Sequence, residues 1–230
     1  MKRQRRRIIA VISIVVTLLG LLVTHIPTDQ FLLDRREVAA TGPAVAALDT
    51  LEVKGRASKA GYSRSAFGEG WKVINGCDTR QIILHRDLRE TVVDSTCRVT
   101  SGVLQDPYTN TTINYQSSQS SAVQIDHIVA LSDAWQKGAQ NLTTAQREQL
   151  ANDPLELLAV DGPSNQQKGD GDAATWLPDN KDFRCEYVSR QIAVKKKYHL
   201  WVTQAEYDAM KTVLSRCPDF PLYQLPLPAL

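Results

Sequence analysis

The chain is 230 residues long and has a formal net charge of +2, from 27 lysine and arginine residues against 25 aspartate and glutamate residues. Five of the positive charges lie in KRQRRR at residues 2–7, and subtracting them from +2 leaves the rest of the chain near −3. Proteins that hold nucleic acid by overall charge attraction are strongly basic, so this class is excluded. Any contact with phosphate must come from a local group of side chains.

The N-terminal basic cluster is followed by an uncharged apolar segment, IIAVISIVVTLLGLLV, at residues 8–23. This order is typical of an export signal or a membrane anchor, and a membrane-spanning helix needs about 20 residues. No Ala-x-Ala site follows, which favours an uncleaved anchor at residues 1–26; cleavage near residues 39–47 is the alternative. Because basic flanks stay in the cytoplasm, the rest is predicted on the extracellular side, tethered to the membrane or secreted after cleavage.

The remaining chain divides into a stalk or linker at residues 27–56, one domain at residues 57–220 and a tail at residues 221–230. Hydrophobic periodicity and turn residues predict a mixture of helices and strands in the domain. Helices are predicted at residues 79–88, 132–139, 143–153 and 187–200, and at 203–217, with Thr143 or Thr144 as an N-cap. Strands are predicted within residues 96–116, with a break at Asp106–Pro107, in the segment ending at Asp126–His127, and at residues 155–160.

The four cysteines, Cys77, Cys97, Cys185 and Cys217, lie in the exported part and lack the C-x-x-C spacing of zinc sites. In an oxidising compartment, two disulfides are the expected use of four such residues. Three pairings are possible. We predict Cys77 with Cys97 and Cys185 with Cys217, because this pairing closes the shorter loops.

An acid and a histidine stand side by side in the apolar segment VQIDHIVAL, residues 123–131. A strand that alternates between two faces has no structural need for adjacent ionisable side chains at Asp126 and His127. A neutral imidazole can accept a proton from water near physiological pH, and a carboxylate can bind a hard divalent cation. An isolated pair of this kind is more often structural than catalytic, so the residues that follow decide the interpretation.

Asn152, Asn165 and Lys168 follow the pair, in ANDPLELLAVDGPSNQQKGD. This order resembles the HNH endonucleases, whose ββα-metal (His-Me finger) core places two strands and a helix around one divalent cation. Blocks such as GYSRSAFGEGW and CDTRQIILHRDL are similar to those of secreted bacterial HNH proteins related to the C-terminal domain of GmrSD-type restriction endonucleases. The resemblance covers residues 60–217 and implies an α+β fold with a ββα-metal core, surrounding helices and two disulfides.

The resemblance also implies a role for each residue of the set. Asp126 and Asn165 are the expected metal ligands and His127 the general base. Asn152, which is expected to open the second strand, braces the loop between the strands and so holds His127 in place, and Lys168 contacts phosphate. The family's first motif letter is His, where this chain has Asp126, and a hard oxygen donor favours Mg²⁺ over Zn²⁺, with Mn²⁺ as an alternative.

The densest positive cluster outside the N-terminal tail is VKKKYH, which contains Lys195, Lys196 and Lys197. A lysine-rich helix face is often simply solvated. In a domain of net negative charge, however, these lysines are the best candidates for holding a phosphate backbone. They are predicted to contact nucleic acid together with Lys168.

The sequence therefore predicts an exported, metal-dependent endonuclease that hydrolyses phosphodiester bonds, with DNA as the expected substrate and RNA as a second possibility. Little sequence specificity is expected, because the sequence contains no recognisable groove-reading helix. Two other classes fit the same fold: a cell-surface binding module that has lost catalysis, and a structural protein stabilised by metal. Plasmid cleavage distinguishes the enzyme from both.

Overall fold

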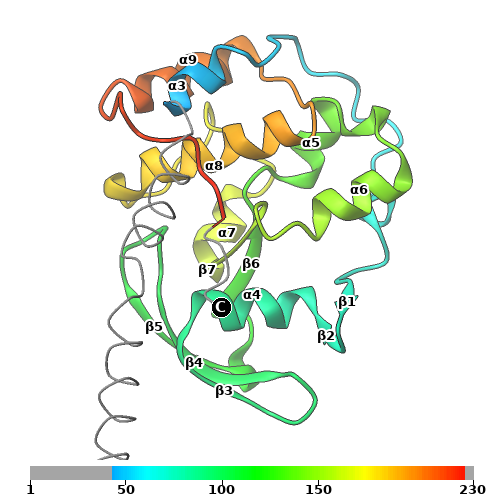
Figure 1. Ribbon diagram of the computed structural model, residues 1–230, viewed down its shortest axis with the longest axis vertical. Helices are drawn as coiled ribbons and strands as arrows, with labels where there is room; N and C mark the ends of the chain where they lie inside the picture. The colour runs from blue at the N-terminus through cyan, green and yellow to red at the C-terminus, as the bar shows by residue number, and fades with distance from the viewer. Residues whose placement is uncertain (1–42, 226–230) are drawn as a thin grey trace, which may run out of the picture. The chain divides into compact units, whose positions relative to one another are not determined.

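A computed structural model describes residues 43–225. This part of the chain combines helices with one three-stranded and two two-stranded antiparallel sheets, the α+β organisation expected from the sequence (Figure 1). The anchor or signal predicted at residues 1–26 lies outside the described residues. Among the helices between residues 43 and 225, none is both long and apolar enough to cross a membrane.

A β-hairpin followed directly by a helix forms the centre of the fold (Figure 1). Strand β6 (Val123–His127) pairs antiparallel with β7 (Leu157–Asp161) in regular register, with His127 opposite Leu157. Helix α7 (Gly162–Lys168) begins at once, because the Asp161 side chain accepts a hydrogen bond from the Ser164 backbone N–H at 2.8 Å. An N-cap carboxylate of this kind satisfies a free donor of the first turn.

The connection between the two hairpin strands contains α5 (Leu131–Gln136) and α6 (Thr144–Ala151). Thr143 is the N-cap of α6, and it forms a capping box with Gln146. Each of these two side chains satisfies a backbone N–H group near the helix start, which explains why the helix begins here. The structure confirms the predicted helix and assigns the cap to Thr143.

On one face of the hairpin, α4 (Thr79–Asp87) packs above the antiparallel sheet of β3 (Arg89–Val93), β4 (Val99–Gln105) and β5 (Thr112–Gln116). The predicted break at Asp106–Pro107 is confirmed as the turn between β4 and β5. Two short strands, β1 (Val73–Ile74) and β2 (Cys77–Asp78), precede α4. One hydrophobic core joins these elements to the hairpin. Ile83 and Leu84 of α4 and Val99 and Leu104 of β4 pack in this core with the inward hairpin residues Val123, Ile125, Leu157 and Ala159.

On the opposite face, α8 (Arg184–Lys197) and α9 (Gln204–Leu214) pack with α3 (Ala44–Leu48). Ala44 and Leu48 are fully buried in this core. The predicted stalk therefore does not extend to residue 56, since residues 44–48 belong to the folded domain. The short apolar segment AVAAL is too brief to show helical periodicity by itself, and its partners lie far along the chain.

The described end of the chain also packs against the domain. The Ser189 hydroxyl on α8 donates a hydrogen bond to the Pro221 carbonyl at 2.8 Å and accepts one from the Tyr223 backbone N–H at 2.7 Å. The Arg190 guanidinium lies 4.3 Å from the centre of the Tyr223 ring. Residues 221–223, which belong to the tail predicted at residues 221–230, are thus held to α8.

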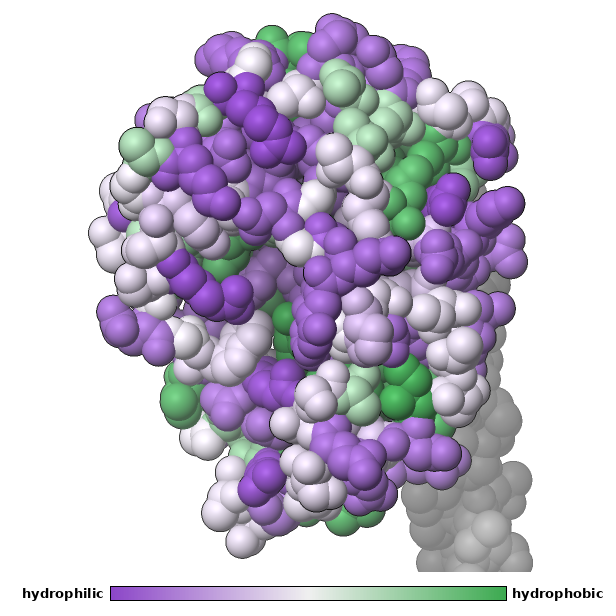
Figure 2. All heavy atoms as spheres, turned by 180° about the vertical axis from the view of Figure 1, so that it is seen from behind, coloured by the Kyte–Doolittle hydropathy of each residue, from purple (hydrophilic) through white to green (hydrophobic). Residues whose placement is uncertain are grey.

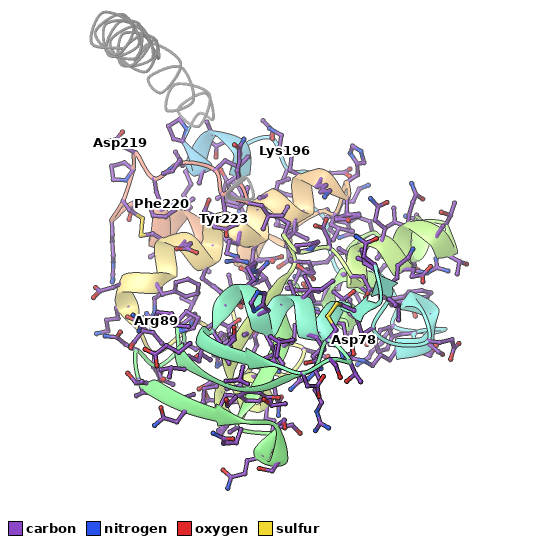
Figure 3. All side chains as sticks on the ribbon, turned by 60° about the horizontal axis from the view of Figure 1, so that its bottom comes forward. Asp78, Arg89, Lys196, Asp219, Phe220 and Tyr223 are labelled. Atoms are coloured by element: carbon purple, nitrogen blue, oxygen red, sulfur yellow. A yellow bond between two sulfur atoms is a disulfide. The ribbon has the colours of Figure 1, made fainter. Side chains whose placement is uncertain are left out.

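Both disulfides have the predicted pairing, Cys77 with Cys97 and Cys185 with Cys217. They lie in different parts of the domain, one beside Asp78 and the other near Phe220 (Figure 3). The first connects β2 to the turn between β3 and β4, and the second connects the start of α8 to the residues that follow α9. Each bridge therefore stabilises a separate region on either side of the hairpin.

The face opposite to that of Figure 1 is mainly hydrophilic, with hydrophobic residues in small separate patches (Figure 2). Five large hydrophobic residues are exposed in the described part: Val53, Val73, Ile74, Val92 and Val93. A few exposed hydrophobic residues of this kind are ordinary on a protein surface.

Candidate active site

His127 is the last residue of β6, and only 6% of it is exposed. Its Nε2 atom lies 3.0 Å from the Ala151 carbonyl oxygen at the end of α6. A carbonyl oxygen can only accept a hydrogen bond, so Nε2 carries the proton and Nδ1 of the neutral ring has a free lone pair. The Trp71 ring stacks on the imidazole, with ring centres 5.7 Å apart and planes 5° from parallel. The ring is thus fixed with its basic nitrogen defined.

A small pocket of about 90 Å³ borders His127 and is called the His127 pocket below. Its lining consists of Arg64, Phe67, Gly68, Gly70, Trp71, His127, Leu131 and Ala151. Most of these residues come from the segment between residues 64 and 71, which contains a short 3₁₀ helix at Arg64–Phe67. The pocket therefore joins a loop near the start of the domain to the end of the central hairpin.

Sequence patterns assign no function to two residues of the His127 pocket, Arg64 and Trp71. Both lie in GYSRSAFGEGW, a block that is similar to secreted HNH proteins as a whole. The sequence feature that could have indicated Arg64 and Trp71 is their position on either side of two glycines, Gly68 and Gly70. Gly68 and Gly70 adopt φ values of 105° and 129°, which only glycine adopts readily.

The surroundings of His127 lower the pKa of its imidazole from 6.5 to about 3. Burial is the largest cause, and the positive charge of Arg64 acts in the same direction. The positive charge of Lys168 adds a smaller lowering, while the hydrogen bond to the Ala151 carbonyl opposes them. In the absence of other ligands, His127 is therefore neutral throughout the physiological pH range.

This lowered pKa predicts a loss of stability in acid. Below pH 6.5 the imidazole takes up a proton in the unfolded chain but stays neutral in the folded protein until about pH 3. The unfolded state is then favoured as pH falls through this window, and at pH 5 the free energy of unfolding decreases by about 2 kcal/mol from this group.

Urea unfolding at pH 7.5 and pH 5 measures the effect, with His127→Gln as the matched variant. Glutamine does not titrate, so the drop between the two pH values is expected to be about 2 kcal/mol smaller in the variant. Equal pH dependence of the two proteins would contradict a lowered pKa for His127.

Asp126 precedes His127 and faces the other side of the strand, since the pairing with β7 is regular through both residues. One of its carboxylate oxygens, Oδ1, lies 2.8 Å from the ammonium of Lys168. The Tyr108 hydroxyl donates a short hydrogen bond to Oδ2. The Lys168 ammonium also donates to the His127 carbonyl oxygen at 2.7 Å. This buried lysine, predicted to contact phosphate, thus connects both members of the pair.

Asn165 lies on the face of the hairpin that carries Asp126. Its side-chain amide donates a hydrogen bond to the Gln124 Oε1 at 2.9 Å, and Gln124 and Asp126 point to the same face of β6. The amide oxygen of Asn165 has no hydrogen-bond partner among residues 43–225. In this described part, no group of three or more His, Cys, Asp and Glu side chains is arranged to hold a metal. Asp126 and Asn165, the two oxygen ligands implied by the resemblance, lie on the same face of the hairpin.

Asn152 is the C-cap residue of α6 and does not open the second strand, which begins five residues later at Leu157. Its side-chain oxygen accepts a hydrogen bond from the Lys72 backbone N–H at 2.8 Å, and its amide donates to the Glu148 carbonyl at 3.1 Å. The first bond fixes the residue next to Trp71. Asn152 therefore braces the loop that stacks on His127.

Residues 79–213 match the family described as GmrSD restriction endonucleases, C-terminal domain. The match covers more than half of the chain and includes β6, β7 and α7. The chain belongs to this GmrSD C-terminal domain family. It is also 38% identical over 183 residues to an uncharacterized secreted protein of Arthroderma benhamiae, covering 78% of this chain and 87% of that protein. No solved structure matches.

The GmrSD family description points to a nuclease-related function for the matched region. The relative from Arthroderma benhamiae is a secreted fungal protein, whereas the sequence predicted similarity to secreted bacterial proteins. The hairpin and α7 lie inside the match, whereas Arg64 and Trp71 precede it. The His127 pocket is therefore built partly by residues outside the matched region.

The three consecutive lysines of this GmrSD domain do not form one surface. Lys195 is fully buried and lies 3.0 Å from the Glu206 carboxylate, so its predicted contact with nucleic acid is wrong. Lys197 is exposed and pairs with Asp153 at 2.6 Å. Lys196 is exposed (labelled in Figure 3) and makes no ion pair with the described residues. Among the three, Lys196 has the most accessible charge.

Proposed function

We propose that this protein is an exported, metal-dependent endonuclease that hydrolyses phosphodiester bonds. The observation that carries the proposal is a neutral imidazole, His127, whose Nδ1 lone pair is free and whose pocket contains an exposed arginine. It lies at the end of a hairpin followed directly by a helix, inside a region that belongs to a restriction-endonuclease family. This order of elements is the one that a ββα-metal core requires.

His127 is proposed to act as the general base. Attack of water on a phosphodiester requires removal of a proton from the water, and a neutral imidazole accepts it. A pKa of about 3 makes the free imidazole a weak base. The negative charge of a bound phosphate stabilises the imidazolium form and raises this pKa toward the working pH. Substrate binding itself thus makes His127 basic enough to react.

Asp126 and Asn165 are proposed to hold the cation. Their carboxylate and amide oxygens fit a hard divalent ion such as Mg²⁺ or Mn²⁺, which takes few protein ligands and completes its shell with water and phosphate. When bound, the ion would supply positive charge to the phosphate and to the departing oxygen. Asp126 and His127 point to opposite faces of β6, so a phosphodiester that contacts both the ion and His127 requires a rearrangement at the end of this strand. Both Asp126 oxygens are engaged, Oδ1 by the Lys168 ammonium at 2.8 Å and Oδ2 by the Tyr108 hydroxyl, so one of these contacts must open when the ion binds.

DNA is the proposed substrate, with RNA as a second possibility, and recognition is expected to depend on phosphate. Export is supported by the basic and apolar N-terminal segments and by the secreted relative. The proposed location is the extracellular side, either tethered to the membrane by residues 1–26 or released after cleavage of that segment.

The proposal is tested by incubating the purified protein with supercoiled plasmid, or with RNA, in Mg²⁺, in Mn²⁺ and in a chelator. Nicked and linear plasmid are expected with metal and only intact plasmid with chelator. Asp126→Ala is expected to cleave more slowly, and excess Mg²⁺ should restore part of its rate. Equal cleavage in chelator would exclude metal dependence. Absence of cleavage under all conditions would favour the binding module without catalysis.

A further inference from the structure

Arg64 is an exposed arginine on the rim of the His127 pocket. Its guanidinium makes no hydrogen bond or ion pair with any residue between 43 and 225, although it stands close enough to His127 to influence the pKa of the imidazole. By contrast, the Lys168 ammonium, the other positive group that lowers the His127 pKa, is bound to Asp126. Arg64 thus contributes a positive charge that has no ion-pair partner among residues 43–225.

The backbone that carries Arg64 is held firmly from three directions. The Ser63 side chain accepts a hydrogen bond from the Ala66 N–H at 3.2 Å, and the Arg147 guanidinium of α6 donates to the Ala66 carbonyl at 2.8 Å. Asn152 fixes the following residues through the Lys72 N–H. A Cβ atom on Gly68 would lie 3.1 Å from the Glu148 side chain, so this glycine permits close packing of the loop on α6. The loop therefore presents Arg64 from a defined position.

An arginine in this position is suited to a phosphate. Its planar guanidinium donates two parallel hydrogen bonds to phosphate oxygens and remains charged at all working pH values. A fixed positive group beside the reacting phosphorus also stabilises negative charge that develops in the transition state. Because His127 lines the same pocket, a phosphate bound by Arg64 lies next to the proposed base.

We propose that Arg64 binds the non-bridging oxygens of the scissile phosphodiester beside His127 and stabilises the transition state of hydrolysis. This inference rests on the proposed nuclease function. It assigns the segment before the GmrSD match a direct part in substrate binding, and it makes the ligand of the His127 pocket a phosphodiester anion.

The test compares Arg64→Ala and Arg64→Lys with Arg89→Ala. Arg89 is an exposed arginine on β3 that makes no side-chain hydrogen bond or ion pair within residues 43–225 (labelled in Figure 3), so it controls for loss of one surface charge. Single-turnover cleavage of a short DNA duplex is expected to fall by about 10²–10³-fold in Arg64→Ala, as for removal of one transition-state donor. Arg64→Lys should retain part of the rate, and Arg89→Ala should match the unmodified protein.

A second measurement does not depend on cleavage. In chelator, fluorescence anisotropy of a labelled oligonucleotide should show weaker binding by Arg64→Ala than by Arg89→Ala. One outcome would overturn the role of Arg64 and leave the nuclease proposal intact. In that outcome the unmodified protein is active, and Arg64→Ala cleaves and binds DNA as well as Arg89→Ala does. An unmodified protein that cleaves nothing with Mg²⁺ or Mn²⁺ would overturn both.

Discussion

Replacement of His127 by alanine is expected to slow phosphodiester cleavage by about 10²–10⁴-fold, the usual contribution of a general base. The imidazole is held by the Ala151 carbonyl and by the stacked Trp71 ring, and its Nδ1 lone pair is free within the described structure. Removal of the ring leaves the proposed metal ligands in place. The measurement is the single-turnover cleavage rate at saturating protein and Mg²⁺, which separates the chemical step from substrate binding.

The matched control is His85→Ala. His85 is exposed on α4, where its Nδ1 atom lies 2.9 Å from the Thr91 hydroxyl, away from the His127 pocket. Its replacement should leave the rate unchanged. Added imidazole should restore part of the activity of His127→Ala, because the small base can enter the space left by the ring. If His127→Ala remained folded and cleaved at the unmodified rate, His127 would be structural and the proposed base would be wrong.

A second large effect is expected in the buried ion cluster between α5, α8 and α9. The Lys137 ammonium lies 2.8 Å from Asp133, 2.8 Å from Asp172 and 2.6 Å from Glu206. Burial lowers the pKa of Lys137, but Glu206 and Asp133 outweigh this and raise it, so the lysine stays charged. With Lys195 and Arg56, the three positive groups balance the three carboxylates. Removing one charge leaves an uncompensated ion in the core.

Lys137→Met is therefore expected to lower the free energy of unfolding by about 3–5 kcal/mol, as for breaking other buried ion pairs. Lys196→Met is the matched control, since exposed Lys196 makes no ion pair with the described residues; it should change stability by less than about 0.5 kcal/mol. The double variant Lys137→Met with Glu206→Gln should recover part of the loss, because it restores the balance of two positive groups and two carboxylates. Equal stability of the Lys137 and Lys196 variants would contradict the proposed balance of charges.

Local signals in the sequence predict much of this fold. The Thr143 capping box, the break at Asp106–Pro107 and the periodicity of α8 and α9 each depend on neighbouring residues, so sequence reasoning finds them. The disulfide pairing is also predicted, because the shorter loops happen to be the ones that the fold closes. Burial of α3 is not predicted, since its partners on α8 and α9 lie far along the chain.

The difference between local signals and contacts of distant residues also explains the wrong prediction at Lys195. Lys195 belongs to three consecutive lysines that are typical of a solvated helix face, yet its partner Glu206 lies on the next helix and only the packing of α8 against α9 brings them together. Folding places the Lys168 ammonium on Asp126 and the His127 carbonyl, and its contact with phosphate stays a prediction. Pairings of this kind depend on tertiary structure.

The candidate site is predictable only in part, for the same reason. Asp126 and His127 stand out because adjacent ionisable residues are unusual in an apolar strand. Arg64 and Trp71 lie more than fifty residues earlier, in a loop without recognisable periodicity, and they reach His127 through hydrogen bonds to α6. The sequence alone therefore does not predict that Arg64 and Trp71 lie beside His127.

A phosphodiester is proposed to bind against His127, and NMR of the ¹⁵N-labelled imidazole tests this binding most directly. The spectrum is recorded in chelator, without and with a short DNA oligonucleotide, and His127→Gln identifies the signals. In the free protein at pH 6, the structure predicts a neutral ring protonated at Nε2. Bound DNA should shift Nδ1 toward its protonated form, because the phosphate charge raises the pKa of His127. Saturating DNA that leaves both ring nitrogens of His127 unchanged would contradict the proposed binding.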